Sequence, residues 1–140
     1  MSSFRSMQKG ENNKGSMRVT KELYSFEIPE RWRGLVDVRK KGYRTDFILL
    51  REEDPSCSGL LASIRCLKRR ITKLDDYTEY LGRIDGPDGE CRWLYASYGR
   101  EGSVSEENED LYWRLRDQLC LVFDSLRPGD GYSMKPGNND

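Results

Sequence analysis

Apolar and polar residues alternate along six stretches of the chain, which is the period of β-strands with one buried face. In the first stretch, residues 24–28 (YSFEI), the alternation stops at Pro29, because proline cannot donate to a strand ladder. Proline suits the first turn of a helix, so residues 29–32 (PERW) predict one short turn that lays Trp32 across the end of the core. The other strands are expected at residues 34–39, 45–51, 60–67, 80–84 and 91–97.

The residues between these stretches predict how the strands pair. Residues 40–42 (KKG) and 85–89 (DGPDG) have the composition of hairpin turns, so the strands on either side of each turn should be antiparallel neighbours. Residues 60–67 (LLASIRCL) are apolar on both faces for much of their length. Such a strand is typical of the middle of a sheet that is covered on both sides.

The last expected element is a helix of about 20 residues. Ser103 and Glu106 have the spacing of a capping box, and Pro128 and Gly129 follow where such a helix would end. Apolar residues recur at helical spacing between these signals and predict a stripe that packs on the sheet, formed by Leu111, Leu115, Leu119, Val122 and Leu126 and flanked by Tyr112 and Phe123.

These elements predict an α+β fold: a single, mostly antiparallel sheet of about six strands with a long C-terminal helix packed on it, plus short helical turns. The expected domain spans residues 21–127. Residues 1–20 and 128–140 mix small and polar side chains without periodicity, so both are expected to be disordered tails.

Charge adds little to this picture, because 24 Lys and Arg balance 24 Asp and Glu. A net charge of zero provides no overall attraction to a polyanion, so neither nucleic acid nor an anionic membrane is an expected partner. Basic residues do cluster at Arg31 with Arg33, at residues 39–41 and at residues 68–70, with Trp32 and Tyr43 interleaved. A nucleic-acid surface is one interpretation of them; solvated charges that cap the strands are the favoured one.

The chain has four cysteines and no histidine, and no two cysteines form a C-x-x-C pair, so a zinc site is not expected. Cys57, Cys66, Cys91 and Cys120 are expected to be free thiols; one or two disulfides in a secreted protein remain the alternative. The chain also lacks a signal peptide and an apolar run of membrane-spanning length. We therefore expect a soluble, cytoplasmic protein.

Three local patterns suggest chemistry, and each has a simpler interpretation. Ser6 and Lys9 match the S-x-x-K pattern of penicillin-recognising enzymes, but they lie in an expected tail with no oxyanion site. The acidic residues at 85–90 lack the spacing of a calcium loop and fit a hairpin turn. Those at 106–110 favour the positive end of a helix dipole. We therefore predict no catalytic residue, no metal ligand and no cofactor.

Trp113 departs from the pattern of the predicted helix. Helical projection places Trp113 about 140° from the centre of the apolar stripe, on the same side as Arg116 and Cys120. Either a tail or the loop of residues 98–105 covers the indole, or Trp113 anchors an interface, since an exposed tryptophan beside an arginine is typical of binding hot spots. Trp113, Arg116 and Cys120 are accordingly the candidate binding residues.

The order of these elements is similar to that of small bacterial domains of uncharacterised function. The segments that carry the similarity are YSFEIPERW, DVRKKGYRTDFILL, GLLASIRCLKR, YLGRIDGPDGECRWLYASY and the amphipathic helix. Together they resemble the Mog1/PsbP-like fold over residues 22–127. This resemblance implies a binding or assembly protein, as members of that fold contact a small GTPase or photosynthetic complexes, and it brings no catalytic residue.

The expected function is therefore that of a non-catalytic protein-interaction or assembly module with an unidentified protein partner. The alternative is a small enzyme or ligand-binding domain with a cleft at the sheet edge. A structure in which Arg92, Tyr95 and Cys91 converge in one concavity would favour that alternative.

Overall fold

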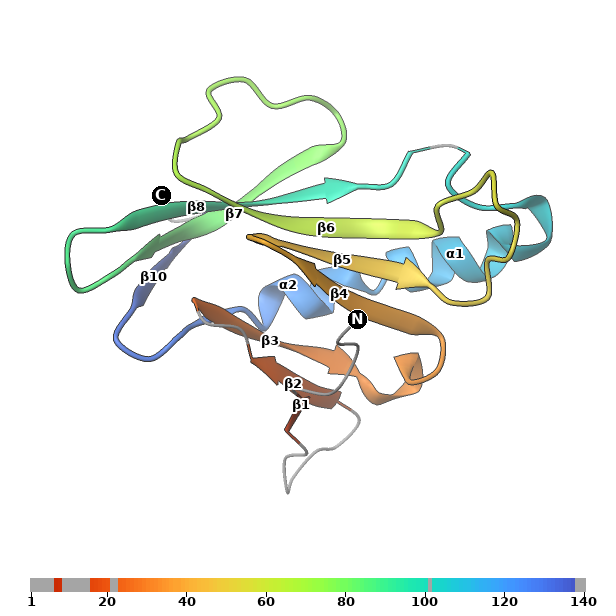
Figure 1. Cartoon of the computed structure of the whole chain (residues 1–140), viewed down its shortest axis with the longest axis horizontal. Coiled ribbons are helices and arrows are strands. Elements are labelled where there is room, and N and C mark those ends of the chain that lie inside the picture. The colour runs from red at the N-terminus through yellow and green to blue at the C-terminus, as the bar shows by residue number, and fades with distance from the viewer. Residues whose placement is uncertain (1–6, 9–15, 21–22, 101, 138–140) are drawn as a thin grey trace.

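The computed structural model describes residues 7–8, 16–20, 23–100 and 102–137, in which two antiparallel sheets enclose a helical segment (Figure 1). The larger sheet has the strand order β10-β7-β8-β6-β5-β4 and the smaller one the order β1-β2-β3-β9. The large sheet comprises β4 (Val36–Lys41), β5 (Arg44–Leu49), β6 (Leu60–Leu67), β7 (Thr78–Asp85), β8 (Cys91–Tyr98) and β10 (Ser133–Pro136). The small sheet comprises β1 (Met7–Gln8), β2 (Ser16–Thr20), β3 (Tyr24–Pro29) and β9 (Arg127–Pro128).

The predicted α+β class and the antiparallel pairing are confirmed, but the prediction of a single sheet is wrong. The first predicted strand, β3, pairs with β2 and β9 and does not join β4. A 3-10 turn, η1 (Glu30–Trp32), and Gly34 with a φ of 81° redirect the chain between β3 and β4. The alternation of residues 24–28 predicts a buried face, and it does not specify which sheet provides that face.

The other five predicted strands form the body of the large sheet. The turns at residues 42–43 and 86–90 join the hairpins β4–β5 and β7–β8, and β6 is central, between β5 and β8. A bulge in the pairing of β5 with β6, at Phe47 and Ile48, places two consecutive β6 residues, Leu61 and Ala62, in the core. The bulge explains why β6 looks apolar on both faces, although Arg65 on its other face is exposed.

The predicted long helix is a helical segment with one irregular point. It consists of η2 (Glu106–Asn108), α1 (Glu109–Arg116) and α2 (Leu119–Asp124). The break between α1 and α2 contains Gln118, whose side-chain oxygen accepts a hydrogen bond of 2.7 Å from Trp32 Nε1. Trp32 is fully buried, so the turn at η1 is attached to the middle of the helical segment.

A carboxylate distant in sequence holds the start of this segment, in place of the predicted Ser103 capping box. Glu52 Oε1 accepts hydrogen bonds from Ser105 N at 2.7 Å, from Ser105 Oγ at 3.0 Å and from Asn108 Nδ2 at 3.3 Å. The bond from the Ser105 backbone N–H is the main cause that lowers the pKa of Glu52. The loop after β5 therefore fixes where the helix begins.

Phe47, at the centre of the core, contacts three other elements. Its ring lies 5.5 Å from Phe26 on β3, 6.3 Å from Trp32 on η1 and 6.4 Å from Phe123 on α2, between ring centroids. All three pairs have edge-to-face geometry, which adds to the free energy gained by burying the rings. These rings join both sheets and the helix in one core.

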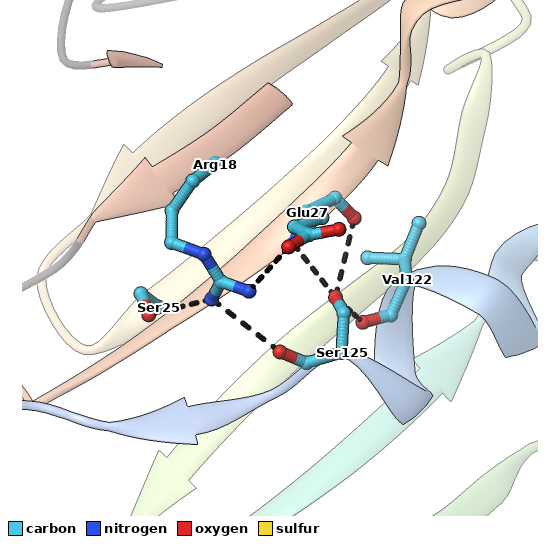
Figure 2. Close-up of polar contacts among 5 residues, drawn as sticks. All are labelled: Arg18, Ser25, Glu27, Val122 and Ser125. Carbon is cyan, nitrogen blue, oxygen red and sulfur yellow. Dashed lines mark hydrogen bonds and ion pairs between the residues drawn. The ribbon is translucent and has the colours of Figure 1, made fainter. Parts of the chain in front are cut away.

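A polar network fastens the small sheet to the end of α2 (Figure 2). Arg18 donates to Ser25 Oγ at 2.8 Å, to Glu27 Oε2 at 2.7 Å and to Ser125 O at 3.4 Å. Ser125 Oγ in turn accepts a 2.6 Å hydrogen bond from Glu27 N. Residues 16–20, expected in a tail, therefore form β2, held by these bonds and by the buried side chain of Met17. Their sequence, SMRVT, alternates over only two apolar residues, which is too short a pattern to predict a strand.

The structure also differs from the expected C-terminal tail at residues 128–140. Residues 133–136 form β10, which pairs antiparallel with β7 at the edge of the large sheet. Gly82 on β7 allows this approach, because a Cβ at that position would lie 2.7 Å from Lys135 O. Tyr132 and Met134 pack against the core beside it. Only these two apolar residues alternate with polar ones in the segment, which is too short a pattern to predict a strand.

Deleting residues 130–140 is therefore expected to destabilise the protein. It removes β10 and the apolar contacts of Tyr132 and Met134, each worth about 1.5 to 3 kcal/mol when fully buried, so we expect a loss of about 2 kcal/mol or more. Urea unfolding followed by fluorescence measures the change, and a chain that ends at Gly137, with β10 intact, is the control. Equal midpoints for the two truncations would show that β10 adds no stability.

Candidate functional site

Trp113 lies on α1, and 45% of its surface is exposed. Its neighbours Tyr112 and Leu115 are buried, because they face the large sheet and the core. The Tyr112 and Trp113 rings meet edge to face at 5.3 Å between centroids. One side of the indole is therefore supported by protein while much of the rest faces solvent.

Arg116 supports Trp113 from the next turn of the helix. Its guanidinium carbon lies 4.7 Å from the centroid of Trp113 and 5.0 Å from that of Tyr98 on β8. Its Nη1 donates a 2.8 Å hydrogen bond to Gly99 O, just after β8. The cation is therefore fixed between two aromatic rings and a carbonyl, which is favourable for cation–π attraction and leaves few rotamers accessible.

Tyr98 continues this arrangement onto the large sheet. Its hydroxyl donates a 2.6 Å hydrogen bond to Glu79 Oε1 on β7, and its ring lies 6.2 Å from Phe123 on α2. Burial, followed by the hydrogen bond and the charge of Glu79, raises the pKa of the Tyr98 phenol, so it stays protonated as the donor at neutral pH. The positive charge of Arg116 lowers this pKa, but its effect is smaller.

Cys120, the third candidate residue, is exposed at the start of α2. Its Sγ lies 3.6 Å from Asp117 O, a contact within the helical segment. The neighbouring Leu121 is 53% exposed. The structure thus brings Trp113 and Arg116 into direct contact and leaves Cys120 and Leu121 as exposed positions further along the helix.

Sequence reasoning missed the residues that hold Arg116 in place. Tyr98 and Gly99 follow a predicted strand and lie far from the helix in sequence, so no local spacing links them to it. Packing requires a glycine at position 99, because a Cβ there would lie 2.6 Å from the Tyr112 hydroxyl. The sequence signal that points to this contact is that Gly99 directly follows Tyr98, the aromatic residue that ends β8.

The alternative site does not assemble. On β8, Arg92 pairs across the sheet with Ile84, on the core side, whereas Tyr95 and Cys91 occupy the opposite face. The Arg92 guanidinium forms a 3.2 Å ion pair with Glu90, and Tyr95 is buried beneath the backbone of Ile71, whose N–H donates to its hydroxyl at 2.8 Å. The three residues therefore do not converge in one concavity, and this observation in favour of the alternative is missing.

An open cleft of about 570 Å³ does lie towards the edge of the large sheet, with a different lining. It separates α2 and the chain after it from β7 and β10, and Glu79 and Asp124 are the charged residues that line it. Its apolar lining is Tyr80, Leu81, Phe123, Leu126 and Met134. Glu79 and Phe123 also contact Tyr98, so this cleft adjoins the Trp113–Arg116 site.

The acidic residues at 85–90 belong to a hairpin turn. Gly86 N donates to Glu90 O at 2.8 Å, and Gly89 has a φ of 81°, which confirms the hairpin turn predicted at residues 85–89. Within the part of the chain that the structure describes, no group of three or more Cys, Asp or Glu side chains is placed to hold a metal ion. Ser6 lies outside the described residues.

The four cysteines are free thiols in different environments. Cys66 is buried, and this burial raises the pKa of its thiol to about 11. Burial and a hydrogen bond with Asp85 also raise the pKa of Cys91. Cys120 is exposed.

Comparison with family models, curated proteins and solved structures finds no match for this chain, so the resemblance to the Mog1/PsbP-like fold stays a prediction. Across the described residues, no helix has the length and apolar character needed to cross a bilayer.

The cysteine environments predict an order of thiol reactivity. At pH 8 a thiol of pKa about 11 is ionised in about one molecule in a thousand, so Cys66 should react with an aromatic disulfide far more slowly than Cys120. Mass spectrometry of alkylated peptides over time measures both rates, and denatured protein, in which four thiols should react alike, is the control. Fewer than four reactive thiols after denaturation, or equal rates in the folded protein, would contradict this description.

Proposed function

We propose that this protein is a non-catalytic interaction or assembly module that binds a protein partner through Trp113 and Arg116. The observation that carries the proposal is the ring–cation–ring arrangement in which Arg116 lies between the exposed Trp113 and the half-buried Tyr98. Tryptophan and arginine dominate binding hot spots, because they bury a large area and form directional contacts in one side chain.

Preorganisation strengthens this proposal. Association costs free energy for each flexible side chain that must be ordered, and an arginine normally contributes a large share of that cost. Here the Gly99 carbonyl and the two rings already order Arg116. The remaining guanidinium donors have no carboxylate partner among the described residues, so a partner that offers a carboxylate beside an apolar side chain fits this surface.

A second candidate is a ligand-binding domain that uses the cleft between α2 and the strands β7 and β10. Its lining combines polar surface, including Glu79 and Asp124, with apolar side chains, which suits a ligand or a bound peptide segment that carries both kinds of group. The cleft adjoins Tyr98, so a partner seated on Trp113 would also reach it. The fold resemblance to binding and assembly proteins agrees with either candidate at the level of analogy.

Replacing Trp113 with alanine should abolish partner capture and leave the fold intact. A photo-reactive amino acid at the exposed position 117, one helical turn from Trp113, leaves the indole in place and identifies the partner in a native lysate. Binding of that partner should weaken about 30-fold or more in Trp113→Ala, the loss expected of a hot spot of about 2 kcal/mol. Unfolding should change by less than about 1 kcal/mol, since nearly half of the side chain is already exposed.

The matched control is Arg114→Ala, an exposed substitution on the same helix. It should retain binding, and Trp113→Tyr should restore part of what alanine loses. If the captured protein binds Trp113→Ala and Arg114→Ala equally well, Trp113 is an ordinary surface residue. A strongly destabilised Trp113→Ala would instead mean that the indole is part of the core.

A further inference from the structure

The face of the large sheet that points away from the helices, here called the outer face, carries aligned basic and aromatic residues. The loop between β6 and β7 rises above this face, opposite α1 and α2 (Figure 1). Strand register places five residues of neighbouring strands in one row across the sheet: Lys41, Arg44, Arg65, Tyr95 and Tyr80. The adjacent row holds Leu67, Trp93, Arg83 and Lys135.

Few carboxylates on the outer face offset these cations. Asp37, Asp46 and Asp85 each form an ion pair with an arginine of the same strand, at 2.8, 3.0 and 3.3 Å. Lys41 and Arg65 are exposed and have no carboxylate partner within the described part of the chain. Their charge is therefore available to an external anion.

The loop of residues 68–77 carries further cations, three of them at its beginning. Its beginning, Lys68-Arg69-Arg70, is exposed. The Arg70 guanidinium lies 5.4 Å from the Tyr80 ring centroid, and Ile71 N donates to the Tyr95 hydroxyl at 2.8 Å. These two contacts hold the basic run beside the row that contains Arg65. The loop has two acidic residues at its other end: Asp75 is engaged with Thr78 Oγ1 at 2.7 Å and with Arg100 at 3.5 Å, and Asp76 is exposed beside it.

The carboxylates that balance the net charge lie mostly elsewhere. Glu52, Glu53 and Asp54 are in the loop after β5, which contacts the start of the helical segment through Ser105. Residues 106–110 carry four more acidic side chains. This acidic end lies at the opposite end of the large sheet from the β4–β5 turn (Figure 1). A net charge of zero is thus the sum of an acidic end and a basic face.

The outer face also carries aromatic rings, which help to decide among the polyanions that its cations could bind. Trp93 and Tyr80 are partly exposed and lie beside the cations in register. An anionic membrane or an acidic peptide requires only the positive charge, whereas single-stranded nucleic acid uses cations for its phosphates and flat rings for its bases. We propose that the outer face binds single-stranded nucleic acid, with Lys41, Arg65 and Arg69 contacting phosphates and Trp93 stacking on a base.

The test is fluorescence anisotropy with a labelled oligouridine of about 15 nucleotides, titrated with the full chain over a series of salt concentrations. Binding should weaken steeply with salt. Each of Lys41→Gln, Arg65→Gln and Arg69→Gln should reduce the slope of log K against log salt by about 0.7, the effect of losing one phosphate contact with a single strand. Arg114→Gln, a neutralisation on the helical side, is the matched control and should leave the slope unchanged.

Stacking is tested separately from charge. Trp93→Leu should weaken binding about 5- to 150-fold, whereas Trp93→Phe should retain most of the affinity, and thermal unfolding checks that both variants are folded. Undetectable binding at about 50 mM salt, or equal effects of Arg65→Gln and Arg114→Gln, would overturn the proposal.

Three competing occupants are measured with the same variants. Vesicles that contain phosphatidylserine, and polyglutamate, should bind more weakly than oligouridine and should not respond to Trp93→Leu. Sedimentation at low salt should show that the protein does not associate with a second copy through its acidic end. If either polyanion binds as tightly as oligouridine, or if self-association occupies the face, the assignment to single-stranded nucleic acid is wrong.

Discussion

The edge-to-face contacts of Phe47 are the constraint on which the rest of the structure depends. One ring on β5 meets Phe26 of the small sheet, Trp32 of the connecting turn and Phe123 of α2. Polar contacts add to this attachment: the Tyr24 hydroxyl on β3 forms a buried 2.7 Å hydrogen bond with Thr45 Oγ1 on β5, whereas the partly exposed ion pair of Arg18 contributes little in solvent. We therefore regard the two sheets and the helical segment as one cooperative unit.

Both candidate surfaces follow from this arrangement. The core fixes α2 through Phe123, and Phe123 also contacts Tyr98, against which Arg116 packs. The helices and the small sheet lie on one side of the large sheet, and the loop of residues 68–77 rises over its outer face (Figure 1). The Trp113–Arg116 site and the basic face are therefore separate, and one domain has room for two partners at once.

Much of the large sheet could be predicted, because the alternation of residues 34–39 through 91–97 and the two hairpin turns are local signals. The strands β2 of the small sheet and β10 of the large sheet could not, since each segment has only two apolar residues in alternation and depends on distant contacts, such as those with Ser125 and Gly82. Within the site, helical spacing placed Trp113 beside Arg116, but the contact with Tyr98 depends on tertiary packing. Net charge likewise could not reveal the basic face, which exists only once strand register aligns Arg44 with Arg65.

Native-state hydrogen exchange tests most directly whether the two sheets and the helix form one unit. The amides of Phe26 on β3, Ile64 on β6 and Val122 on α2 should exchange with the same free energy of opening, equal to that of global unfolding and equally dependent on denaturant. If Phe26 exchanges through an opening several kcal/mol below that of Ile64, the small sheet unfolds by itself and Phe47 does not couple the layers.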